Sequence, residues 1–299
     1  MGQQGALVCV GVGMMLGAHL TPRARAEIVQ ADVVFALVSD PIVELWLQEL
    51  RPDVRSLQVH YGTGGDTGKP RDQSYREMVA AMLEEVRAGR RVCGAFYGHP
   101  GVFAVVPHRA IAQARADGYE ARMEPGVSAE DCLYADLGID PGTHGCQHLD
   151  ASQLLWYRHV LDPCSYLVLW QVGVAGDRSL RSFGVDASHI ELLADRLLRD
   201  YPFEHEVIAY EAATLPIAKP RMERVRLGAM AATQWHLHTT LVVPPARARE
   251  AEAVFKGRPA SPQGILHGPE TRQPSDEGKQ HVESDPVPGI RGRSAWAAA

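Results

Sequence analysis

The chain has no long hydrophobic run and no excess of positive charge. No stretch approaches the roughly 18 consecutive apolar residues of a membrane-spanning helix, and the N-terminus lacks the basic start and apolar core of a signal peptide. We therefore expect a cytoplasmic protein with no membrane partner. The formal net charge of −6 leaves no basic footprint, so no nucleic-acid partner is expected either.

Cysteine is sparse and irregularly spaced. The five cysteines are odd in number, and no two of them form a C-x-x-C pair. This pattern argues against both a disulfide framework and a zinc site. We expect no metal-binding residues and interpret most of the thiols as small buried hydrophobic groups.

The first half of the chain alternates between strand-like and helix-like patterns. Strands are expected at residues 6–12, 33–38, 56–59 and 91–95, and helices at residues 22–30, 41–50, 75–88 and 107–117. This alternation is typical of a mostly parallel sheet with helices on its faces. The predicted fold class is therefore α/β.

The second half has more closely spaced strand patterns. Helices are expected at residues 129–137 and 190–200, and strands at 166–172, 207–210, 222–225 and 239–243. Their spacing predicts a mixed sheet with hairpins. We expect an N-terminal domain at 1–123, a C-terminal domain at 124–245 and, because 259–293 is rich in proline, glycine and charge, a disordered tail at 246–299.

Glycine-bounded turns follow two of the predicted strands. Gly11 and Gly13 follow the first strand, although Leu16 stands where a dinucleotide fingerprint requires its third glycine. Residues 97–103 (YGHPGVF) follow the strand at 91–95 and bring a phenol and an imidazole to its carboxyl end. Because open α/β sheets bind small molecules at such ends, this turn is a candidate ligand site.

Two further segments carry polar side chains that a purely structural role could explain. In residues 125–131 (PGVSAED), Ser128 is expected to cap a helix with Asp131 reaching back, yet the same helix start could receive a carboxylate or a ribose. The glycine-rich loop at 60–71 is not a phosphate loop, because Pro70 stands where serine or threonine should be. Taken alone, its tyrosines are best explained as surface residues.

Together, these segments resemble the tetrapyrrole-methylase superfamily of S-adenosylmethionine-dependent methyltransferases, over roughly residues 5–245. Within it, the chain is most similar to the borosin peptide backbone α-N-methyltransferases. That similarity is carried by residues 96–103 (FYGHPGVF), 128–138 (SAEDCLYADLG) and 170–173 (WQVG). The resemblance implies a two-domain fold with the cofactor in the cleft between the domains, S-adenosyl-L-homocysteine as a product, and a homodimer.

The resemblance also implies the site residues. The implied catalytic residues are Tyr61, Arg71, Tyr75 and Tyr97. The implied cofactor-binding residues are Gly11, Gly13, Tyr97, His99, Gly101, Val102, Phe103, Ser128, Ala129 and Gln171. Of these, His99 is expected to shape its turn rather than to act as a base.

The chemistry of backbone methylation suggests roles for these side chains. An amide nitrogen is a poor nucleophile because its lone pair is delocalised into the carbonyl. We expect Tyr75 or Tyr61, acidified by Arg71, to remove or relay the amide proton. Tyr97 would donate a hydrogen bond to the developing oxyanion.

The expected substrate is a small precursor peptide, modified in trans as part of the biosynthesis of a ribosomally made peptide. Fungal relatives methylate their own apolar tail, whereas the chain after Pro244 has only scattered apolar residues. Automethylation of this tail stays an alternative, as does methylation of a tetrapyrrole such as a precorrin. A peptide-binding protein without turnover is a further alternative.

Overall fold

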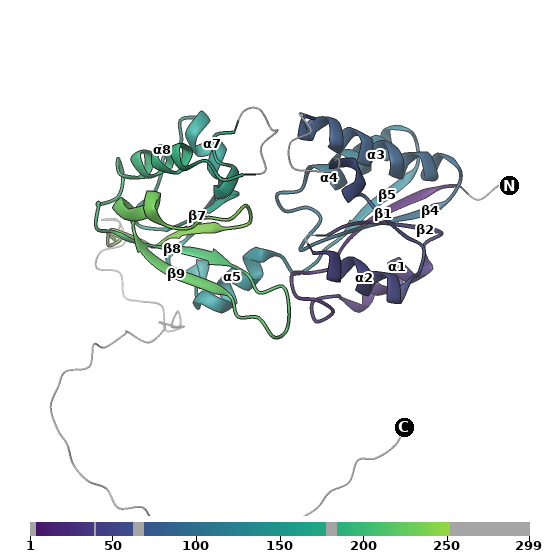
Figure 1. Ribbon diagram of the computed structural model, residues 1–299, viewed down its shortest axis with the longest axis horizontal. Coiled ribbons are helices and arrows are strands. Elements are labelled where there is room, and N and C mark those ends of the chain that lie inside the picture. The colour runs from purple at the N-terminus through teal and green to yellow at the C-terminus, as the bar shows by residue number, and fades with distance from the viewer. Residues whose placement is uncertain (1–3, 39, 62–68, 178–183, 252–299) are drawn as a thin grey trace, which may run out of the picture. The chain divides into compact units, whose positions relative to one another are not determined.

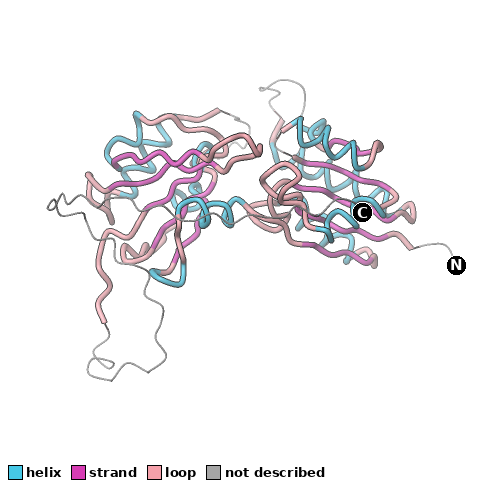
Figure 2. The backbone as a smooth tube through the Cα atoms, turned by 90° about the horizontal axis from the view of Figure 1, so that it is seen from below, coloured by secondary structure: helices cyan, strands magenta, loops and turns pink. Residues whose placement is uncertain are grey.

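The computed structural model describes residues 4–38, 40–61, 69–177 and 184–251. The chain up to Arg249 forms one compact unit, which contains two separate five-stranded sheets (Figure 1). Figure 2 shows the strands of each sheet as a group of neighbouring segments with helices beside them. The predicted α/β class is confirmed.

The first sheet is entirely parallel, with the strand order β3-β2-β4-β1-β5. Its strands are β1 (Ala6–Gly11), β2 (Val33–Leu37), β3 (Val54–Ser56), β4 (Arg91–Phe96) and β5 (Glu120–Glu124). Leu7 and Cys9 of β1 belong to the core on one face, and Val8 and Val10 to the core on the other. Burial on both faces explains why this strand reads as a continuous apolar run.

Helices cover both faces of this sheet. They are α1 (Pro22–Gln30), α2 (Pro41–Leu50), α3 (Arg71–Arg87) and α4 (Val105–Ala116). Ile28 of α1 and Leu47 of α2 pack in one core, whereas Met82 of α3 and Ile111 of α4 pack in the other. Figure 1 shows the two pairs on opposite faces.

The second sheet is mixed, as predicted, with the order β6-β7-β10-β8-β9. Its strands are β6 (Cys146–Asp150), β7 (Tyr166–Trp170), β8 (Glu206–Glu211), β9 (Arg221–Arg226) and β10 (Thr240–Val243). β6 and β7 are parallel, and the other pairs are antiparallel. The helices of this half are α5 (Ala129–Leu137), α6 (Pro141–His144), α7 (Ala151–Trp156) and α8 (Ala187–Leu197).

Several predicted boundaries are wrong. The helix expected from residue 75 begins at Arg71, because the first turn of α3 is polar and shows no apolar period. Instead of a strand at 56–59, β3 ends at Ser56 and a 3-10 helix, η1, spans Gln58–Tyr61. Strands β5 and β6 were not predicted at all.

The end of the compact unit includes the start of the predicted tail. The backbone N–H groups of Ala246 and Arg247 donate to the carbonyl of Pro163 at 2.8 and 3.1 Å. The rest of the predicted tail, from residue 252 onward, lies outside the described residues. Among the described helices, none is both long and apolar enough to cross a membrane.

Candidate functional site

The turns after β1 and β4 are joined by backbone hydrogen bonds. These two strands are neighbours in the sheet, so their carboxyl ends lie side by side. Gly13 donates to the carbonyl of Gly98 at 3.2 Å, and Gly98 donates back to Gly13 at 2.9 Å. The structure therefore brings Gly11 and Gly13 next to the turn at 97–103.

Gly11, Gly98 and Gly126 let the segment before α5 approach these turns closely. A Cβ on Gly11 would stand 2.4 Å from the oxygen of Gly98 and 2.7 Å from the Cα of Gly126. A Cβ on Gly126 would meet the same backbone at the same distances. No side chain fits there, so Gly126 holds Ser128 and Ala129 close to the ends of β1 and β4.

Two predicted cofactor-binding residues have unusual backbone angles. Phe103 has φ 49° and Gln171 has φ 58°, and within the described ranges no other non-glycine residue has a positive φ. Such a conformation costs about 1–2 kcal/mol, and backbone strain of this kind concentrates at functional sites. The ring of Phe103 lies 5.3 Å from that of Trp170, at the end of β7. This contact brings Gln171 to the same turn.

Two polar residues of the site have structural partners. Ser128 accepts a hydrogen bond from the N–H of Asp131 at 3.2 Å and donates to its carboxylate at 2.7 Å, so the predicted cap of α5 is confirmed. The Nδ1 atom of His99 accepts from the N–H of Gly101 at 2.8 Å. A ring nitrogen committed to its own turn agrees with the expectation that His99 shapes the turn.

The tyrosines implied as catalytic lie close together. The rings of Tyr61 and Tyr75 are 6.3 Å apart in an edge-to-face arrangement. The phenol of Tyr75 contributes to the raised pKa of both Tyr61 and Tyr97, so Tyr75 neighbours each of them. Tyr97 exposes about half of its residue surface to solvent, although its hydroxyl is desolvated.

The expected acidification of Tyr61 is wrong. Burial raises its pKa well above the ordinary value, and the neighbouring phenols of Tyr75 and Tyr97 raise it further. The charge of Arg71 does lower the pKa of Tyr61, but by less than these opposing effects. Desolvation also raises the pKa of Tyr97. Both phenols are therefore hydrogen-bond donors at neutral pH.

Arg71 has a carboxylate partner that the sequence did not predict. As the first residue of α3, it forms an ion pair with Asp177 at 3.2 Å, and both side chains are largely buried. Its charge also lowers the pKa of Asp150, although burial of that carboxyl outweighs the effect and raises the pKa. In the sequence, Asp177 is marked only by its position, four residues after the Trp-Gln-Val-Gly segment.

The comparisons with known proteins identify a methylase family. Residues 6–231 match the family model described as Tetrapyrrole (Corrin/Porphyrin) Methylases. The chain is 43% identical over 213 residues to a methyltransferase/type I borosin cyclic peptide precursor of Mycena rosella, covering 71% of this chain and 52% of that protein. It is 35% identical over 303 residues to the methyltransferase/lentinulin A precursor of Lentinula edodes, covering 99% and 71%.

Solved structures show the same fold at lower sequence identity. Uroporphyrin-III-C-methyltransferase from Thermus thermophilus aligns with a TM-score of 0.56 at 20% identity, over 81% of this chain and 93% of that one. The precorrin-6Y methylase of Archaeoglobus fulgidus aligns with a TM-score of 0.52 at 17% identity, over 82% and 99%. The chain spans about half the length of several curated relatives it matches.

Proposed function

Because the chain belongs to the tetrapyrrole (corrin/porphyrin) methylase family, we propose that it is an S-adenosylmethionine-dependent methyltransferase. We further propose that it N-methylates backbone amides of a small ribosomally made precursor peptide. The fungal relatives support this substrate class, since their names combine a methyltransferase with a borosin or cyclic peptide precursor.

The observation that carries the proposal is the group of tyrosines beside Arg71. Methylation of a tetrapyrrole needs no group that deprotonates an amide, whereas backbone methylation does. Tyr75 packs against Tyr61, and the helix that carries Tyr75 begins with Arg71. A possible base, a proton donor and a fixed cation therefore stand within one part of the structure.

The backbone around the turns fits a cofactor. Gly11, Gly98 and Gly126 let three backbone segments pack against one another, so the turns after β1 and β4 and the start of α5 lie close together. We assign cofactor binding to this region, with the strained residues Phe103 and Gln171 at its edge. When bound, S-adenosylmethionine supplies an electrophilic methyl group. Methyl transfer would require the acceptor nitrogen in line with that group, so positioning by the turns would contribute much of the rate.

We assign the proton transfer to Tyr75 rather than to Tyr61. The pKa of Tyr61 is raised, so its hydroxyl stays protonated and donates to Tyr75. We assign to Tyr75 the acceptance of the proton from the amide nitrogen, as the negative charge moves onto the carbonyl oxygen. Tyr97 stays protonated as well and donates to that oxygen, a contribution of ~3 kcal/mol in comparable sites.

We propose that the peptide is supplied in trans and that the enzyme is a homodimer. The region after Pro244 has only scattered apolar residues and does not read as a core peptide. The proposed domains, 1–123 and 124–245, each contain one of the two sheets apart from the last residue of β5. Automethylation of the tail is the competing arrangement.

The test is mass spectrometry of the protein co-expressed with a small open reading frame encoded beside it. Increments of one methylene on backbone amides of the peptide would support the proposal, and fragmentation would locate them. Increments on this chain's own tail would favour automethylation. If both chains stay unmodified while S-adenosylhomocysteine binds, tetrapyrroles are the next substrates to test.

A matched variant then tests the role of Tyr75. Tyr75→Phe removes the hydroxyl and keeps the ring contact with Tyr61. We expect at least a ~100-fold loss of turnover, the usual range for a group that transfers a proton, with unchanged affinity for S-adenosylhomocysteine. Unchanged turnover would remove Tyr75 from the mechanism.

A further inference from the structure

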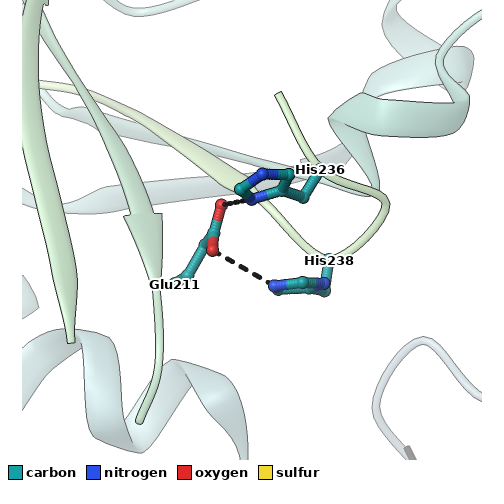
Figure 3. Close-up of side chains that lie close together, drawn as sticks. All are labelled: Glu211, His236 and His238. Carbon is teal, nitrogen blue, oxygen red and sulfur yellow. Dashed lines mark hydrogen bonds and ion pairs between the residues drawn. The ribbon is translucent and has the colours of Figure 1, made fainter. Parts of the chain in front are cut away.

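Two histidines and a glutamate converge outside the proposed methyl-transfer site. Glu211 ends β8, and His236 and His238 stand on the loop before β10 (Figure 3). The Nδ1 atom of His236 lies 2.8 Å from one carboxylate oxygen of Glu211, and the Nε2 atom of His238 lies 3.1 Å from the other. The ligand atoms of the three side chains all lie within 4.8 Å of one another.

This set of donors suits a divalent transition-metal ion. Imidazole nitrogens and a carboxylate oxygen are common ligands of zinc and related ions, and three protein ligands leave a fourth position for water. Bonds of about 2.0–2.2 Å in a tetrahedral site separate neighbouring ligand atoms by roughly 3.3–3.5 Å. The 3.1 Å between the Nε2 atom of His238 and the Oε2 atom of Glu211 is within a few tenths of an ångström of that geometry. The 2.8 Å between the Nδ1 atom of His236 and the Oε1 atom is shorter, so the exposed imidazole of His236 would move outward on binding.

The exposure of the three side chains supports access by an ion. Glu211 exposes 12% of its side chain, His236 40% and His238 72%. The carboxylate is thus fixed in the protein, while both imidazoles reach solvent and can adjust. A neutral imidazole can present its lone pair to a metal once its proton moves to the other ring nitrogen.

Other groups hold the carboxylate in place. Thr239 donates to the Oε1 atom of Glu211 at 2.6 Å, and Arg221 donates to the same oxygen at 2.7 Å. These contacts orient Glu211 and compete with a metal for Oε1. The Oε2 atom, which faces His238, is the oxygen better placed to bind a metal ion.

We propose that Glu211, His236 and His238 bind one divalent transition-metal ion of the zinc type. Metal bonds would join the end of β8 to the loop at 236–239. That loop packs on Gly173, since a Cβ there would stand 2.4 Å from the carbonyl oxygen of His236. The ion would therefore make the loop at 236–239 more rigid, and with it the segment after Gln171 that packs on this loop.

The proposal is tested by titrating metal-stripped, tag-free protein with Co²⁺ and following its visible absorption, then displacing Co²⁺ with Zn²⁺. We expect one ion per chain. The variants His236→Gln and His238→Gln should each bind at least ~100-fold more weakly, since loss even of groups that only support a ligand costs 10- to 100-fold. His144→Gln is the matched control, because this histidine contacts Tyr166 edge-to-face and stands outside the cluster.

A second readout is thermal unfolding. A ~100-fold excess of Zn²⁺ over its dissociation constant should raise Tm by about 5–10 °C in the wild type and in His144→Gln, and by much less in the other two variants. Binding that survives in His236→Gln and His238→Gln, or the absence of a stoichiometric ion in the wild type, would overturn the proposal. The titration needs no methyl donor or peptide, so its failure would leave the methyltransferase proposal intact.

Discussion

At the residue scale, the pairing of Arg71 with Asp177 determines where the positive charge of the site lies. Both side chains are mostly withdrawn from water, and their atoms approach to 3.2 Å. A buried ion pair adds little net stability, but each partner restricts the position of the other charge. We therefore interpret Asp177 as a positioning residue that fixes the guanidinium of Arg71 beside the phenols.

Replacement of this carboxylate should lower turnover without removing the cofactor. In Asp177→Asn the guanidinium loses its ion pair with this carboxylate, and a shift of about 1 Å at a reacting group costs up to ~100-fold in rate. We expect kcat to fall by about 10- to 100-fold, with unchanged affinity for S-adenosylhomocysteine. Steady-state kinetics and calorimetry measure the two quantities. Asp195→Asn, on the exposed side of α8, is the control and should match the wild type in both.

The raised pKa of Tyr61 predicts a specific dependence of stability on alkaline pH. Its folded pKa lies above its unfolded value of about 10, so its contribution to stability is full below pH 10 and is lost as the pH rises toward the folded pKa. Above pH 10, the stability of the wild type relative to Tyr61→Phe should fall by about 1.4 kcal/mol per pH unit.

Urea unfolding of both proteins between pH 8 and ~12 measures this difference. Tyr61→Phe lacks the titrating hydroxyl and keeps the ring, so other alkaline effects cancel in the comparison. A difference that stays constant across this range would show that Tyr61 ionises equally in both states.

The residues of the candidate site differ in how well the sequence predicted them. Tyr61, Arg71, Tyr75 and Tyr97 were named from the family resemblance, and the structure places the three tyrosines together. Asp177 was not named, because it lies 106 residues from Arg71 and carries no local pattern. The acidification of Tyr61 was wrong because burial cannot be read from the sequence around it.

At the scale of elements, the close approach of three backbone segments makes Gly126 a sensitive position. In Gly126→Ala the new Cβ would stand 2.4 Å from the oxygen of Gly98 and 2.7 Å from the Cα of Gly11. Both are backbone atoms, so the segments must separate. We expect a loss of about 1–3 kcal/mol in the free energy of unfolding and at least a ~10-fold weaker affinity for S-adenosylhomocysteine.

Gly118→Ala is the control for this prediction. Gly118 has φ 86° but open space around its missing Cβ, so the substitution strains only the backbone, at about 1–2 kcal/mol. It should destabilise the protein similarly and leave the affinity for S-adenosylhomocysteine unchanged. Equal losses of affinity in the two variants would mean that the approach of Gly126 has no role in cofactor binding.

Elements with strong local signals were predicted well. Thr21 caps α1 with Pro22 in its first turn, and the Ser128–Asp131 capping box begins α5 as expected. Strand β5 was missed because its charged side chains hide the alternation of an edge strand. Strand β6 was missed because it contains polar side chains where a buried strand is expected to be apolar. One of them, His148, is satisfied inside the structure: Trp170 donates to its Nδ1 atom at 3.1 Å, and the hydroxyl of Tyr134 lies 2.7 Å from its Nε2 atom.

At the scale of the whole molecule, contacts distant in sequence join the segments that carry the candidate site. The N–H of Leu16, after β1, donates to the carbonyl of Thr214, after β8, at 2.9 Å. The ring contact of Phe103 with Trp170 adds a second such link. No periodic pattern encodes these pairings. The sequence therefore predicted two sheets, but the contacts between their loops came only from the structure.

Cofactor binding should accordingly stabilise the whole compact unit rather than one half. The proposed cofactor-binding residues come from loops of both sheets, so unfolding of either half removes the site. At ~100-fold excess over its dissociation constant, S-adenosylhomocysteine should raise Tm by about 5–10 °C, and the transition should stay single. Differential scanning calorimetry measures both, with Gly126→Ala as the weakened variant. Two separate transitions, of which only one shifts, would place the ligand within one half and contradict a site built from both.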